Sequence, residues 1–270
     1  MRFVILVLFL LAAFVATAEE AVVGLPLDGE EAVTFLRTAE VVGEPETFDD
    51  KAITAPVRVT LTDGERTLRA IFKDESTYHH AFNFGDGTKV DRVTDTYKHE
   101  LAAYELDLLL GLGIVPPCVE RELFRRTGSL CMWIEDAMDE AKRRERRIKP
   151  PDLRQWYDQM HRVQLFQHLV NDLDRANIRN IVSDPEFKIY KVDSSMSFYP
   201  DRSLRDEGLP TRFSRQFLEA LESLDQAALE ERLKPWTRKS ERKALWVRRQ
   251  RILDLAAKQV EERGESEVLY

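Results

Sequence analysis

The chain has only two cysteines, Cys118 and Cys131, among its 270 residues. Two cysteines are too few for the disulfide framework that supports many small exported domains. The segment between them, VERELFRRTGSLCMWIE, alternates as a β-hairpin does, and Thr127-Gly128 predicts its turn. A turn at that place would put the two cysteines out of register. The sequence therefore favours two cysteines that do not pair.

Basic residues are in the minority. The chain has 40 Lys and Arg against 48 Asp and Glu, a formal net charge of −8. Nonspecific binding of nucleic acid depends on neutralisation of phosphates by a basic surface. This composition excludes that class of partner, and we expect no nucleic acid.

Long apolar runs are absent except at the amino terminus, where residues 3 to 15 are all apolar. Arg2 precedes this run and Ala16-Thr17-Ala18 follows it, the small-x-small pattern of a signal-peptidase site. The run is shorter than the roughly 20 residues that a spanning helix needs. We predict a signal peptide over residues 1–18, no stable membrane span after its removal, and a mature chain that is secreted, periplasmic or in the lumen of the secretory pathway.

The remaining chain alternates strand and helix signals. VRVTLTDGERTLRAIFK predicts two strands joined at Asp63-Gly64, and DESTYHHAFNFGDGTKVDRVTD reads as a polar loop. TYKHELAAYELDLLLGLG predicts a helix with Thr94 or Thr96 as its N-cap and Gly111 or Gly113 at its end. IVPPCVERELF and GSLCMWIEDAM then follow as a strand pair.

The second half is mostly helical. LRQWYDQMHRVQLFQHLV predicts an amphipathic helix, FKIYKVD a strand, and residues 214–263 further helices. The order of elements predicts a two-lobed α+β fold with its seam near residues 135–138. We expect a β-rich lobe over 19–134, a helical lobe over 135–262 and a tail over 263–270.

The segment NDLDRANIRNIV, residues 171–182, contains most of the candidate catalytic and metal-binding residues. It holds Asp174, Asn177 and Asn180, and the strand that follows ends at Asp193. Carboxylate and carboxamide oxygens suit Mg²⁺ or Mn²⁺, and one carboxylate would remain to orient a hydroxyl. Phosphoryl transfer needs that set, together with a cation on the phosphates. Lys73, at a predicted strand end, and a glutamate on the next helix, Glu100, complete it.

These segments resemble a known family. RAIFK, YKHELAAYELDLLLGLGIVPPCVER, GSLCMWIEDAM and VNDLDRANIRNI with IYKVDSSMSF are similar to atypical kinase-like proteins related to bacterial HipA-like kinases, phosphatidylinositol kinases and secretory-pathway casein kinases. The resemblance covers residues 34–262 and implies a two-lobed kinase-like fold, with ATP and Mg²⁺ or Mn²⁺ as cofactors. It implies that Lys73 contacts the ATP phosphates, Glu100 holds Lys73, Asp174 is the catalytic carboxylate, and Asn180 and Asp193 bind the metal. The implied adenine-contacting residues are Met132, Trp133, Ile134, Glu135, Asp136 and Ala137.

Two features depart from that family. Its metal-binding asparagine follows the catalytic aspartate by five residues, whereas Asn180 follows Asp174 by six. Asp172 with Asn177 restores the spacing of five but leaves Asp174 without a role, so Asn177 stays open as the alternative ligand. The stretch FDDKAITAP also lacks the glycines that often cover ATP. An exported metal-dependent ATP phosphotransferase with an unknown protein, glycan or lipid hydroxyl acceptor is the favoured function. A catalytically weak pseudokinase that binds nucleotide or regulates partners is the alternative.

Overall fold

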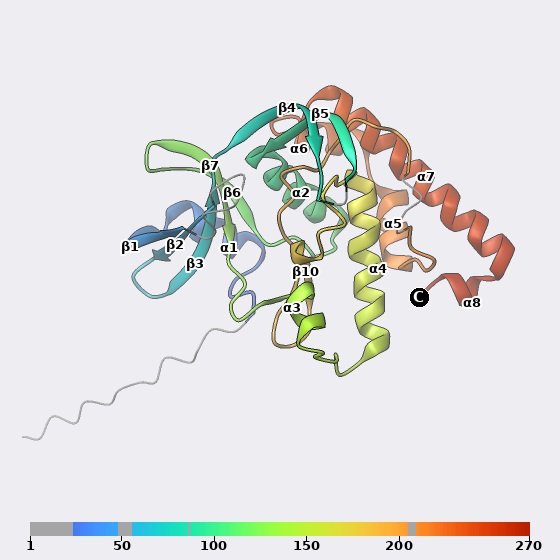
Figure 1. Ribbon diagram of the computed structural model, residues 1–270, viewed down its shortest axis with the longest axis horizontal. Helices are drawn as coiled ribbons and strands as arrows, with labels where there is room; N and C mark the ends of the chain where they lie inside the picture. Colours follow the sequence, from blue (N-terminus) through green and yellow to red (C-terminus); the bar gives the residue numbers. More distant parts are fainter. Residues whose placement is uncertain (1–23, 48–55, 86, 205–208) are drawn as a thin grey trace, which may run out of the picture.

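The computed structural model describes residues 24–47, 56–85, 87–204 and 209–270. The predicted signal peptide and nearly all of FDDKAITAP lie outside these ranges. The described residues form a β-rich part, on the left of Figure 1, and a mostly helical part on the right. This is the predicted two-lobed α+β architecture.

Within the described residues, a first helix is followed by strands, a second helix and further strands, and the remainder is helical except for two short strands. The strands are β1 (Glu40–Thr47), β2 (Val57–Thr62), β3 (Thr67–Lys73), β4 (Ser76–Asn83), β5 (Lys89–Thr96), β6 (Cys118–Leu123), β7 (Arg126–Met132), β8 (Met138–Asp139), β9 (Ile181–Ser183) and β10 (Ile189–Lys191). The helices are α1 (Gly29–Thr38), α2 (Tyr97–Leu110), α3 (Glu140–Glu145), α4 (Leu153–Val170), the 3₁₀ turn η1 (Ile178–Asn180), α5 (Arg215–Ser223), α6 (Gln226–Leu233), α7 (Lys239–Arg263) and α8 (Glu265–Val268).

An antiparallel sheet of five strands, in the order β1-β2-β3-β7-β6, forms the β-rich part. The predicted alternation in β2 and β3 is confirmed, because Leu61, Ala70 and Phe72 are fully buried. Helices α1 and α2 pack against β6 and β7 and share one hydrophobic core with these residues. Lys73 ends the central strand β3 and has the opposite side-chain phase from Phe72.

The β6–β7 hairpin contradicts the prediction of unpaired cysteines. It turns at Phe124 and Arg125, both with left-handed φ (54° and 63°), and not at Thr127-Gly128. Two central residues with positive φ match the right-handed twist of the flanking strands. Cys118 consequently lies directly opposite Cys131, and the two form a disulfide.

Gly128 does not form the predicted turn. It lies inside β7, where a Cβ atom would collide with the backbone carbonyl of Lys73 on the neighbouring strand. The glycine therefore permits the close approach of two strands at the point where β3 ends.

Removal of the disulfide should destabilise the protein. The bond joins residues 13 apart in sequence, and restriction of the unfolded chain by a loop of this size contributes about 3 kcal/mol. Urea unfolding of the Cys118→Ser/Cys131→Ser variant, followed by tryptophan fluorescence, measures the loss. A reductant should lower the unfolding free energy of the wild type to that of the variant and leave the variant unchanged. Equal values for oxidised and reduced wild type would contradict the prediction.

Residues 74–95 form a two-stranded hairpin, β4–β5, where the sequence predicted a loop. Most β4 side chains are exposed, and Arg92 of β5 has a left-handed φ of 57°. Because β4 is exposed on both faces, it lacks the alternation of apolar and polar residues that predicts a strand from the sequence. One face of the hairpin packs Val90 and Val93 against Leu173. The hairpin thus rests on the polar loop, residues 171–180.

Helix α2 has the predicted caps. The Thr96 side chain accepts from the Lys98 backbone N–H, and Gly111 ends the helix with a left-handed φ of 61°. Glycine takes this conformation without a Cβ penalty. Beyond it, the Ile114 carbonyl accepts from the Lys191 N–H at 2.7 Å, which joins the end of α2 to β10.

The helical part holds the polar loop in place. α4 ends at Asn171, which has a left-handed φ of 49°, and the loop begins there. Arg248 of α7 is fully buried and donates from Nε to the Leu169 carbonyl at 2.8 Å, so α7 fixes the end of α4. The helices predicted over 214–263 are confirmed as α5, α6 and α7. Residues 263–270, predicted as a tail, include α8, and Val268 is buried.

Candidate active site

Three charged side chains from distant segments meet at the border of the two parts. The Lys73 ammonium at the end of β3 lies 2.8 Å from Oε1 of Glu100 on α2. It lies equally close, 2.8 Å, to Oδ1 of Asp193, which follows β10. The ion pair predicted between Lys73 and Glu100 is therefore present. The Lys73 and Glu100 side chains are nearly buried, whereas 44% of the Asp193 side chain is exposed.

The two carboxylates keep Lys73 charged. Burial alone would lower the pKa of the ammonium, but Asp193 and Glu100 outweigh it and raise that pKa above its usual value. Burial likewise opposes ionisation of Asp193, and the neighbouring Lys73 lowers the pKa of this carboxyl to about 2. The Lys73 ammonium is thus held between the side chains of Glu100 and Asp193.

Helix α2 also binds the backbone that follows Asp193. The second oxygen of Glu100, Oε2, accepts from the Ser194 N–H at 2.9 Å. Asp193 itself has a left-handed φ of 58°, so the chain turns sharply after β10. Its Oδ1 accepts from Lys73 and from the Ser195 hydroxyl at 3.2 Å, and within the described residues Oδ2 takes no hydrogen bond.

The polar loop surrounds Asp174 with amides. Asn177 and Asn180 each donate from Nδ2 to the same oxygen, Oδ2 of Asp174, at 2.9 and 2.8 Å. Burial raises the pKa of the Asp174 carboxyl, and the amide bonds oppose this shift only in part. In the part of the chain that the structure describes, Oδ1 of Asp174 is left without a partner.

The chain is similar to known proteins in structure but not in sequence. No protein-family model matches the chain, and no curated protein shows significant sequence similarity. Solved structures do match. The structure of hydra Fam20 with sugar superposes with a TM-score of 0.66 at 17% identity, covering 93% of this chain and 95% of that one.

Two further solved structures are similar to this chain. The Golgi casein kinase gives a TM-score of 0.59 at 14% identity, over 88% of this chain and 78% of that one. The Helicobacter pylori proinflammatory kinase CtkA gives 0.50 at 13% identity, over 84% and 98%. The chain has an atypical kinase-like fold. The resemblance stated from the sequence is confirmed at the level of the fold.

Within this kinase-like fold, the two candidate asparagines differ in their surroundings. Asn180 is buried, and its backbone carbonyl accepts from the Val192 N–H at 2.9 Å, one residue before Asp193. Asn177 is less buried and uses its Oδ1 to cap η1 by accepting from the Arg179 N–H. These contacts favour Asn180 as the metal ligand beside Asp193, which stays a prediction.

The segment predicted to contact adenine, residues 132–137, connects β7 to β8. The ring of Trp133 lies beneath two guanidinium groups, with its centroid 5.3 Å from Cζ of Arg58 and 6.0 Å from Cζ of Arg69. The other members differ in burial: Met132, Ile134 and Glu135 are buried, Ala137 is partly exposed and Asp136 is exposed.

Glu135 is held from two sides. Its carboxylate pairs with Arg69, and its backbone N–H and C=O bond Gly24 at 2.7 and 3.1 Å. Neighbouring residues of an extended segment point their backbone groups to opposite sides. Within the described residues, no backbone hydrogen bond is recorded for Ile134.

A buried ion pair that the sequence analysis missed supports the site. Lys191 Nζ lies 3.1 Å from Oδ2 of Asp172, and both side chains are fully buried. The ammonium also donates to the carbonyls of Val192 and Asp193 at 2.7 and 2.6 Å, and Asp172 Oδ1 accepts from the Asp174 N–H at 3.0 Å. One pair thus links the backbones of Asp174 and Asp193. The only available signal was a lysine at the end of a short apolar strand.

Proposed function

We propose that the chain is an exported, metal-dependent ATP phosphotransferase of atypical kinase type, acting on a hydroxyl acceptor. The observation that carries the proposal is the meeting of Lys73, Glu100 and Asp193, which come from β3, α2 and the segment after β10. A cation held between two carboxylates beside an amide-bonded aspartate is the arrangement that phosphoryl transfer uses.

The donor set fits a divalent cation and nucleotide phosphates. Oδ2 of Asp193 and the carboxamide oxygen of Asn180 are hard ligands of the kind that Mg²⁺ and Mn²⁺ prefer. A bound divalent cation would supply neutralisation of the charge on the transferred phosphoryl group. Lys73 would hold phosphate oxygens, and Glu100 would keep the ammonium aimed at them. The adenine base would lie against residues 132–137.

Asp174 has the features of the carboxylate that receives the acceptor proton. Its Oδ2 is fixed by two amides, so the side chain has a set orientation. The remaining oxygen could accept a hydrogen bond from a hydroxyl and take its proton during transfer. A carboxyl with a raised pKa is a better proton acceptor than an ordinary aspartate once it is ionised.

The comparisons indicate which acceptors to test first. The hydra Fam20 structure contains a sugar, and the Golgi kinase is named for casein. Glycan and protein hydroxyls are therefore the first two classes to test, with lipid hydroxyls as the third. Transfer of labelled phosphate to each class, with and without the divalent cation, separates them.

ATP with Mg²⁺ or Mn²⁺ should raise the thermal midpoint of the mature protein, because a ligand that binds the native state stabilises it by about 2.7 kcal/mol at a concentration of 100 Kd. Lys73→Met should lose most of this shift and remain folded. Lys98→Met, which changes an exposed lysine on α2, is the matched control and should keep it. No shift in the wild type at millimolar ATP would count against the proposal.

The pseudokinase alternative rests on the six-residue spacing between Asp174 and Asn180 and on the lack of glycines in FDDKAITAP. It predicts a nucleotide-dependent rise in the thermal midpoint without any phosphate transfer. Binding and turnover measured on the same preparation thus separate the two functions.

Export is part of the proposal. The disulfide between Cys118 and Cys131 suits an oxidising compartment. One of the similar structures is a Golgi protein by name. Among the described residues, no helix has both the length and the apolar character needed to cross a membrane.

Amino-terminal sequencing of the natively expressed protein should find a chain that begins near Glu19, because signal peptidase accepts the Ala16-Thr17-Ala18 pattern. Fractionation should recover it outside the cytoplasm. An intact Met1 on a membrane-bound product would contradict cleavage and make the apolar run an anchor.

A further inference from the structure

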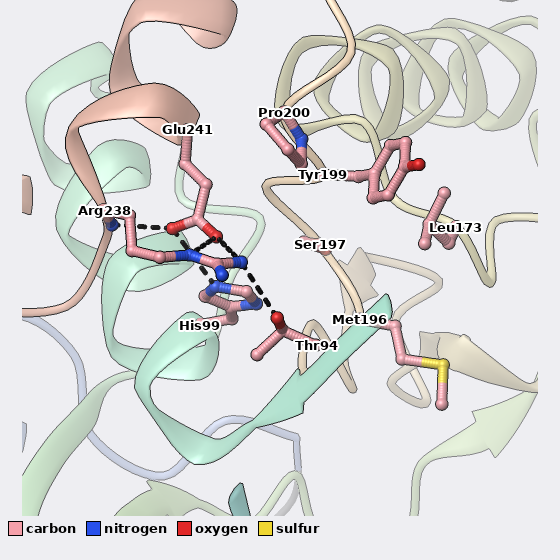
Figure 2. A pocket seen from close by; sticks show the side chains of 9 residues that line it. All are labelled: Thr94, His99, Leu173, Met196, Ser197, Tyr199, Pro200, Arg238 and Glu241. Carbon is pink, nitrogen blue, oxygen red and sulfur yellow. Dashed lines mark hydrogen bonds and ion pairs between the residues drawn. The ribbon is translucent and has the colours of Figure 1, made fainter. Parts of the chain in front are cut away.

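A tight pocket lies where α2, β5, the segment after Asp193 and the start of α7 meet. Its lining residues are Thr94, His99, Leu173, Met196, Ser197, Tyr199, Pro200, Arg238 and Glu241. Figure 2 shows Arg238, the N-cap of α7, next to the Thr94 side chain, and Glu241 of α7 next to His99. The space between these side chains is too small for a water molecule. The polar groups in it therefore act on one another and not on a ligand.

The first turn of α2 and its N-cap contact the two residues that follow Asp193. The Ser195 carbonyl accepts from the Thr96 N–H at 3.1 Å and lies 3.0 Å from Nδ1 of His99. Together with the bond from Ser194 to Glu100, these contacts tie the orientation of α2 to the position of Asp193. His99 is next to Glu100 in the sequence, so any rotation of this turn moves both residues.

The other side of His99 faces α7. Its Nε2 lies 3.7 Å from Oε2 of Glu241, and both side chains are buried. Glu241 is fixed in turn by Arg238, whose backbone N–H donates to Oε2 at 2.7 Å and whose Nε donates to Oε1 at 2.8 Å. Arg238 also donates to the Thr94 hydroxyl at 2.9 Å. The start of α7 is thereby joined to both β5 and α2.

The partners of His99 determine its protons. The Ser195 carbonyl can only accept, so Nδ1 carries a hydrogen. Nε2 faces the Glu241 carboxylate, which also only accepts. Burial opposes ionisation of Glu241, but the contacts with His99 and Arg238 lower the pKa of its carboxyl. The Glu241 carboxylate is therefore held by His99 on one element and by Arg238 on another.

We propose that His99 and Glu241 are positioning residues that lock α2 onto α7, so that Glu100 pairs with Lys73 and Asp193 keeps its orientation. This inference rests on the proposed function, because it assigns a regulatory contact to the same site. Neither residue touches the nucleotide. Loss of the pair should let the first turn of α2 rotate and release Ser194 and Ser195, which weakens the hold of Lys73 on ATP.

Substitutions can separate positioning from packing. His99→Phe keeps the aromatic ring and its contact with the Phe198 ring, whose centroid is 5.4 Å away, but removes both donors. His99→Gln keeps one donor for the Ser195 carbonyl. Glu241→Gln keeps an oxygen for the Arg238 N–H and loses the charge. His80→Gln, at an exposed histidine of β4, is the matched control.

The test measures the dissociation constant for ATP–Mg²⁺ by thermal-shift titration and amide hydrogen exchange of residues 194–198 by mass spectrometry. His99→Phe and Glu241→Gln should each weaken ATP–Mg²⁺ binding roughly tenfold and speed exchange to a similar degree, as expected for loss of a charge-assisted contact. His99→Gln should lie between these and the wild type. The variant with both changes should be no weaker than either single variant, and His80→Gln should match the wild type.

Two results would overturn the inference. One is wild-type affinity and exchange in His99→Phe, which would show that the ring only fills space. The other is a variant with both His99→Phe and Glu241→Gln whose ATP affinity falls by the product of the two single losses, because two residues of one contact should not act independently. If the wild type itself binds no ATP, the proposed function fails, and unchanged exchange of residues 194–198 in His99→Phe then decides against the lock on its own.

Discussion

Asp174→Asn should lower the rate of phosphoryl transfer by about a hundredfold to ten-thousandfold, the usual contribution of a positioned general base. The amide has the shape of the carboxylate, and its carbonyl oxygen can still accept from Asn177 and Asn180. The loop should therefore keep its conformation while losing the group that accepts a proton. Labelled-phosphate transfer measures the rate, and the thermal shift with ATP–Mg²⁺ should stay at the wild-type value.

The matched control for this change is Asp91→Asn, at an exposed aspartate of β5. It should transfer phosphate at the wild-type rate. If Asp174→Asn retains more than about a tenth of the activity, Asp174 is not the base. If neither protein transfers phosphate and both bind ATP, the pseudokinase alternative holds.

The pH dependence of kcat/KM is a second test of the Asp174 carboxylate. Burial raises the pKa of Asp174 above its usual value, and a general base must be ionised to act. The value of kcat/KM should therefore fall as the pH drops through this raised pKa and reach a plateau at higher pH. Residual activity of Asp174→Asn should lack that acidic limb. An unchanged limb in the variant would assign the titration to another group.

The features that the sequence predicted correctly are those with local signals. Helix α2 has a threonine N-cap and a glycine C-cap within the segment itself, and β2 and β3 alternate over their whole length. The pairing of Lys73 with Glu100 also followed from the sequence, because the order of elements indicates a kinase-like fold in which a strand lysine meets a helix glutamate.

The features that it missed depend on contacts between segments. The turn at Phe124-Arg125 has left-handed φ values but contains no glycine or asparagine that would predict it. Gly128 predicts a turn, but it lies in a strand and allows the Lys73 backbone to come close. The β4–β5 hairpin gains its packing from Leu173, far along the chain. Pairings of this kind appear only when the strands are placed next to one another.

The burial of Lys191 also depends on contacts between segments, and among these features its loss should have the largest effect on stability. A lysine in a short strand usually reaches solvent, since burial of an unpaired charge is costly. Here the ammonium is fully buried because Asp172 lies 3.1 Å away and two backbone carbonyls accept from it. The pair joins the start of the polar loop to the end of β10, and so it sets the distance between the proposed base and the proposed metal ligand.

Lys191→Met should therefore destabilise the protein by about 3–5 kcal/mol, because it leaves the Asp172 carboxylate buried without a countercharge. Urea unfolding followed by the fluorescence of the four tryptophans measures the loss. Adding Asp172→Asn to this variant should recover much of the stability, since a neutral amide can still accept from the Asp174 N–H. Lys188→Met, at an exposed lysine on the same hairpin, should stay within about 1 kcal/mol of the wild type. If Lys191→Met unfolds at the wild-type urea concentration, or if the added Asp172→Asn lowers stability further, the buried pair does not hold the two segments together.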